Sequence, residues 1–111
     1  MITSETVTID GRNFELRLTR KGLRAAEAVG LNMDEIKTAP FSQIPLMFIA
    51  MTHGSLPSRL SYARAEELTD ELFDSGEMSP RDFIEMFSEG MSELINPTVA
   101  TPTAKKNQTK E

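Results

Sequence analysis

Residues 6–18 alternate apolar and polar side chains in two short runs. The segment "TVTIDGRNFELRL" places an Asp-Gly pair between these runs. Asp-Gly tolerates the positive φ angles that a two-residue type I′ turn requires, so the pattern predicts a β-hairpin over residues 5–18. An isolated hairpin is only marginally stable in water, so one face must pack on other elements. The apolar positions of that face are Val7, Ile9, Phe14, Leu16 and Leu18.

Beyond the hairpin, apolar positions recur every three or four residues, which is typical of α-helices. Thr19 suits an N-cap, and Ser79 followed by Pro80 marks another helix start. A turn-like piece is expected around "NMDEIKTAP", ahead of a helix in which Pro45 fits only in the first turn. The four predicted helices span about residues 20–29, 41–53, 61–75 and 80–95.

The segment "IPLMFIAMTHG", residues 44–54, is apolar on all sides of a helix. A helix of this kind must be covered by other elements, so we expect it to be the central core helix. About 20 apolar residues are needed to cross a bilayer, and this run is far shorter. The open question is whether Met47 and Met51 are enclosed by their own chain or leave an apolar flank for a partner.

The whole chain is predicted to be one α+β domain with a disordered tail. Its 111 residues, 39% of them hydrophobic, suit a single modest core. Residues 1–96 form the predicted domain of hairpin and helical bundle. Residues 97–111 contain no aromatic side chain and are rich in Thr, Lys and Pro, which predicts disorder. The N-terminus lacks the basic and apolar segments of a secretory signal, and we expect an intracellular location.

Charge is distributed unevenly along the chain. The formal net charge of −5 disfavours nucleic-acid binding, which draws on a basic face. Residues 12–24 carry five basic side chains and one acid, whereas residues 61–95 carry ten acids and two bases. Three interpretations are open: the basic stretch packs against the acidic helices, both stretches are solvated faces, or the acidic helices form a surface for a positively charged partner.

The sequence offers no catalytic or metal-binding pattern. It has no cysteine and a single histidine, His53, so thiolate chemistry is absent and a metal site or a catalytic triad would have to be assembled from distant carboxylates or hydroxyls. The glycines are too widely spaced for a phosphate-binding fingerprint. We therefore expect a protein that is not an enzyme and needs no cofactor.

Methionine is the remaining unusual feature, with seven in the chain. Its flexible thioether fills irregular cores and is also common on surfaces that accept several partner shapes. The apolar helices therefore leave room for a groove that takes a partner helix. The candidate partner-binding residues, each of which could equally belong to the core, are Met47, Met51, Phe83, Met86, Phe87, Met91 and Leu94.

The order of these segments resembles a known family. The hairpin and first helix "TVTIDGRNFELRLTRKGLRAAEAVG", an apolar helix ending in "THG", the acidic "ARAEELTDELFDSG" and the helix led by "SPRDFIEMF" are similar to the small tail assembly chaperones of long-tailed phages and prophages of Gram-positive bacteria. The resemblance covers about residues 5–95 and contains no catalytic motif.

The resemblance implies a non-enzymatic protein of the host cytoplasm that is absent from the mature virion. Such chaperones are expected to bind the long, helix-rich tape measure protein, keep it soluble, and help to recruit tail tube protein. A small adaptor or regulatory domain that binds a partner helix outside tail assembly is the alternative. Self-association is also open, because a hairpin edge can pair with another chain.

Overall fold

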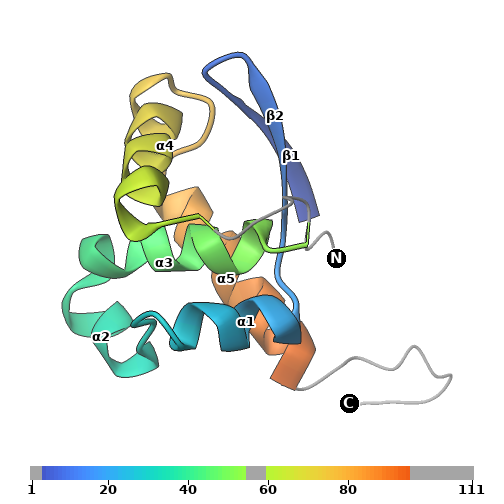
Figure 1. Ribbon diagram of the computed structural model, residues 1–111, viewed down its shortest axis with the longest axis vertical. Helices are drawn as coiled ribbons and strands as arrows, with labels where there is room; N and C mark the ends of the chain where they lie inside the picture. The colour runs from blue at the N-terminus through green and yellow to red at the C-terminus, as the bar shows by residue number, and fades with distance from the viewer. Residues whose placement is uncertain (1–3, 55–59, 96–111) are drawn as a thin grey trace, which may run out of the picture.

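The computed structural model describes residues 4–54 and 60–95, in which a two-stranded hairpin is followed by five helices (Figure 1). The predicted α+β class is confirmed. The predicted disordered tail, residues 97–111, lies outside the described residues. The elements are β1 (Ser4–Ile9), β2 (Arg12–Arg17), α1 (Arg20–Glu27), α2 (Met33–Thr38), α3 (Pro40–Thr52), α4 (Tyr62–Asp74) and α5 (Pro80–Ile95).

The hairpin forms as the Asp-Gly pair predicts. Asp10 and Gly11 have φ angles of 54° and 77°, the left-handed conformation that a type I′ turn needs. Pairing is antiparallel from Ile9 opposite Arg12 to Ser4 opposite Arg17. This register places the alternating apolar side chains on one face, where they are buried against the helices.

Helix α3 is the centre of the core. Every residue from Gln43 to Thr52 is buried, and the helix packs against α1, α4 and β2. The expectation that Pro45 lies in the first turn is wrong, because α3 begins at Pro40 and Pro45 is its sixth residue. Proline cannot donate to the carbonyl four residues earlier, which belongs to Phe41 at the exposed start of the helix.

The turn-like piece before α3 is in fact a short helix, α2. The Asn32 side chain caps it by accepting hydrogen bonds from the backbone N–H groups of Asp34 and Glu35. The backbone N–H of Asn32 in turn donates to Oε1 of the buried Gln43 at 2.8 Å. A side chain of α3 therefore fixes the position of the α2 cap, and α2 lies beside the start of α3.

Close approach of α1 to α3 depends on a glycine. Gly22 is buried in α1, and a Cβ at this position would overlap the carbonyl oxygen of Ala50 in α3. Helix α1 ends at Glu27, two residues before the predicted end at residue 29. The predicted bounds of α4 and α5 agree with the structure to within one residue.

Candidate protein-binding surfaces

Most of the predicted partner-binding residues lie inside the core. The buried ones are Met47, Met51, Phe83, Met86 and Phe87, with exposed fractions between 0 and 8%. Met91 and Leu94 are half-buried and pack against the edge of the core. The five buried residues pack on their own chain and present almost no surface to a partner. The predicted residues that a partner can reach are therefore those at the end of α5.

An apolar groove lies between α2 and α5, and we call it the α2–α5 groove. Its volume is about 340 Å³. Two of the predicted residues, Phe87 and Met91, are in its lining, and Ile95 at its end is 73% exposed. The full lining is Met33, Ile36, Lys37, Phe87, Ser88, Met91 and Ile95.

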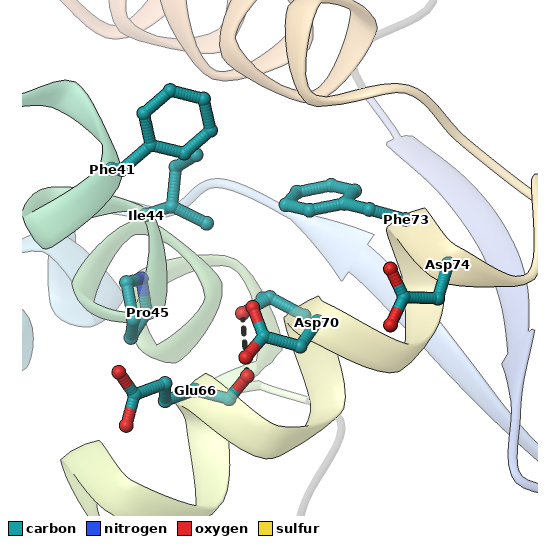
Figure 2. A pocket seen from close by; sticks show the side chains of 8 residues that line it. Phe41, Ile44, Pro45, Glu66, Asp70, Phe73 and Asp74 are labelled. Carbon is teal, nitrogen blue, oxygen red and sulfur yellow. Dashed lines mark hydrogen bonds between the residues drawn. The ribbon is translucent and has the colours of Figure 1, made fainter.

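A second surface, which we call the acidic hollow, lies between α3 and α4 and has a volume of about 230 Å³ (Figure 2). Figure 2 shows apolar side chains of α3 facing α4, which contributes one aromatic ring and a row of carboxylates. The aromatic ring of Phe41 is largely in solvent, with 70% of the residue exposed. The full lining is Phe41, Ile44, Pro45, Glu66, Thr69, Asp70, Phe73 and Asp74.

Hydrogen bonds at the N-terminus of α4 hold the two walls of the hollow in place. Ser61 caps α4 by accepting from the backbone N–H of Arg64 at 3.1 Å. The Tyr62 hydroxyl donates to the carbonyl of Ser42 in α3 at 3.0 Å. Desolvation by burial, and then the negative charge of Glu66, raise the pKa of Tyr62 above its ordinary value of 10.0. The hydroxyl thus stays protonated and keeps its bond to α3.

Inside the hollow wall, the one buried polar side chain of α4 is satisfied locally. Thr69 is 1% exposed, and its hydroxyl donates to the carbonyl of Ala65 at 3.0 Å and approaches that of Glu66 at 3.1 Å. Phe73, beside it, makes an edge-on contact with Phe83 of α5 at a centroid distance of 5.7 Å. The Thr69 hydroxyl is therefore already hydrogen-bonded within α4. Binding of a partner at this surface would depend on the apolar floor and the acidic rim.

In the described part of the chain, no ion pair joins the basic stretch, residues 12–24, to the acidic helices, although the Arg20 guanidinium donates to the carbonyl of Leu94 in α5 at 3.3 Å. Ion pairs between described residues join Arg64 to Glu67 at 3.0 Å and Arg81 to Glu85 at 3.4 Å, each within one helix. The stretch instead makes other contacts: the Arg12 guanidinium lies 5.3 Å from the centre of the Phe14 ring. The row of acids on α4 is therefore not neutralised by the basic residues of β2 and α1.

Metal-ligand clusters and membrane-spanning helices are absent from the described residues. Within residues 4–54 and 60–95, no three His, Asp or Glu side chains gather closely enough to hold a metal ion. Nor does any helix there have the length and apolar character needed to cross a membrane. His53 is the C-cap residue of α3 and is half-buried.

Sequence reasoning does not single out several residues that line the two surfaces. Met33 and Ile36 belong to the segment expected to be a turn, and Phe41 was only the expected start of a helix. The signal for Phe41 is its position in the first turn of an otherwise apolar helix, because a helical side chain lies over the preceding turn and a first turn has none before it.

Comparison with known proteins identifies no relative of this chain. No family model matches the chain, and neither a curated protein nor a solved structure matches it. The resemblance to tail assembly chaperones therefore rests on the order and character of the segments alone.

Proposed function

We propose that this protein is a phage or prophage tail assembly chaperone, a non-enzymatic protein that binds the helical tape measure protein. The observation that supports the proposal is the exposed α2–α5 groove, whose lining is mainly apolar. An amphipathic helix binds such a groove by laying its apolar face into it. A tape measure protein is expected to be long and helix-rich, and thus to offer many such faces.

The composition of the groove suits a bound partner, here called the client, whose sequence varies along its length. Met33 and Met91 contribute flexible thioethers on opposite walls, which adapt to side chains of different shape. Ile95 supplies a large exposed apolar surface at the open end. The formal net charge of −5 would keep a complex with an apolar client in solution.

In this role the protein acts in the cytoplasm of the host and leaves before the virion is complete. It keeps the tape measure protein soluble and helps to recruit tail tube protein around it. The alternative is a small adaptor that binds a partner helix outside tail assembly through the same groove. Gene neighbourhood separates the two: a tail tube gene just upstream and a very long helical reading frame just downstream are expected only for the chaperone.

Co-expression with the tape measure protein encoded downstream tests the proposal directly. The client should move to the soluble fraction, and a complex should elute in size-exclusion chromatography. The double variant Met91→Ser/Ile95→Ser removes apolar contacts from the groove and should lose this effect. Val29→Ser is the matched control, because Val29 is 42% exposed and lies outside the groove lining.

Two results would refute the proposal. Client solubility that does not change with the wild-type protein removes the chaperone function. Equal activity of the groove variant and the Val29→Ser control would show that the client does not use the α2–α5 groove.

A further inference from the structure

We propose that the acidic hollow is a second docking surface, and that it binds a helical segment of another protein that carries Lys or Arg in one row beside a large apolar side chain. This surface shares no lining residue with the α2–α5 groove. The inference therefore goes beyond the proposed function and does not depend on it.

The size of the hollow favours a protein side chain as the occupant. Its volume of about 230 Å³ is below the roughly 300–1,000 Å³ typical of sites for small molecules. Ile44, Pro45 and Phe73 form an apolar floor, and the exposed ring of Phe41 stands at the edge. A partner that covers the Phe41 ring would remove a large apolar surface from water.

The acids on α4 determine which partner fits the hollow. Glu66, Asp70 and Asp74 follow one another at four-residue spacing, so their carboxylates lie along one side of α4 (Figure 2). Eight residues of helix rise about 12 Å, so the row spans roughly two turns. None of the three carboxylates forms an ion pair with a described residue. A partner helix lying along α4 with basic residues one turn apart would match this row.

Lys and Arg suit both parts of the surface at once. Their aliphatic stems can cover the apolar floor while the charged ends reach the carboxylates. The face of an exposed aromatic ring such as Phe41 also attracts a cation. A basic side chain is therefore a better complement than a purely apolar one, which would leave the acids desolvated and unpaired.

A second copy of this chain fits the hollow less well. The exposed large hydrophobic residues in the described part of the chain are Val29, Phe41, Tyr62 and Ile95. In the described helices, basic residues at four-residue spacing occur at Arg20 and Arg24 of α1, and the exposed hydrophobic residue nearest to them in sequence, Val29, is smaller than the hollow. The geometry thus favours a different protein as the source of the basic segment.

A designed helical peptide tests the proposal with the full chain. The probe is a labelled peptide with three Lys residues at four-residue spacing beside a central Phe, and binding is followed by fluorescence anisotropy. We expect micromolar affinity at low salt and weaker binding as salt rises. The variant Glu66→Gln/Asp70→Asn/Asp74→Asn should bind about tenfold or more weakly. It keeps the fold, because it removes like charges at four-residue spacing.

Two controls separate this site from general attraction to an acidic protein. The variant Glu27→Gln/Glu89→Gln/Glu93→Gln removes the same charge away from the hollow and should bind like the wild type. A peptide in which Ser replaces Phe should bind about tenfold more weakly to the wild type. Phe41→Ala, at a mostly exposed position, should weaken binding of the original peptide about fivefold without loss of folding.

Each contrary outcome overturns the proposal. Equal binding by the two charge variants would show attraction to net charge only. Equal binding of the Phe and Ser peptides would exclude the apolar floor. Sedimentation that shows self-association of the wild type, lost in the Glu66→Gln/Asp70→Asn/Asp74→Asn variant, would assign the hollow to a second copy of the chain.

Discussion

Replacing Gly22 by alanine should destabilise the fold, although glycine to alanine within a helix is ordinarily stabilising. Gly22 lies in α1 at its contact with α3, and its backbone N–H donates to the Thr19 cap at 3.0 Å. An added Cβ would overlap the carbonyl oxygen of Ala50 and lie 3.1 Å from its carbonyl carbon. Because the obstacle is backbone, it cannot rotate away, and α1 must move away from α3.

Two opposing terms set the magnitude. Alanine gains about 0.5–1 kcal/mol over glycine through helix propensity. Overpacking of a tight core contact costs about 1–3 kcal/mol, and a clash with backbone belongs at the upper end of that range. The net effect of Gly22→Ala should thus be a loss of about 2 kcal/mol. For a domain of this size, that loss lowers the Tm by about 8–16 °C.

Urea unfolding followed by far-UV circular dichroism measures the effect, since the chain has no tryptophan. Gly54→Ala is the control, because a Cβ there meets no heavy atom within 4 Å and the residue has no positive φ. This control should stay within about 0.5 kcal/mol of the wild type. A Gly22→Ala variant as stable as the wild type would refute the close α1–α3 packing.

Three further predictions concern single side chains. Tyr62 is the only tyrosine in the chain, so absorbance at 295 nm follows its titration, whose midpoint should lie above pH 10.0 and should fall in Glu66→Gln. Because the pKa of Tyr62 is raised in the folded state, the associated stability is present below the unfolded pKa and is lost as pH rises through the folded pKa. A wild-type midpoint at or below pH 10.0 would contradict the desolvation argument. Phe48→Ala should cost about 3–5 kcal/mol in urea unfolding, because the side chain is fully buried, and a loss under about 1 kcal/mol would be inconsistent with its place in the core. Gln43→Leu leaves the backbone N–H of Asn32 without its acceptor, so the free energy of unfolding should fall by about 1–3 kcal/mol and the Asn32 amide should exchange its hydrogen faster. Unchanged exchange of the Asn32 amide would exclude the 2.8 Å hydrogen bond.

The parts of the fold that sequence predicts well are those with local causes. The hairpin follows from one Asp-Gly pair between alternating runs, and α5 follows from Ser79, whose hydroxyl accepts from the backbone N–H of Asp82 at 3.1 Å. The expectation of a turn in place of α2 is wrong although Asn32 is a local N-cap, because this helix has only six residues and none of them is buried, so it leaves no apolar stripe in the sequence. The expected position of Pro45 is wrong for a different reason: packing on nearly all sides maintains α3 despite an interior proline.

The candidate surfaces show a different limit. An apolar residue at helical spacing faces either its own core or a partner, and both positions give the same pattern. Phe83 and Met91 are eight residues apart on α5 and were equivalent candidates, yet one is fully buried and the other borders the α2–α5 groove. Phe83 packs on Phe48 of α3 and Phe73 of α4, whereas Met91 lies beside α2, so tertiary contacts that the pattern does not contain distinguish the two.

The burial of α3 also determines where partners can bind. Met47 and Met51 are 0 and 2% exposed, so the central helix has no apolar flank of its own. Exposed apolar surface remains where a neighbouring element leaves an edge open: beside α2, which has no buried residue, and at Phe41, before the buried part of α3 begins. The edge beside α2 is bordered by methionines, so it should select the apolar face of a partner helix. The edge at Phe41 is bordered by three acids, so it should select a basic helix face.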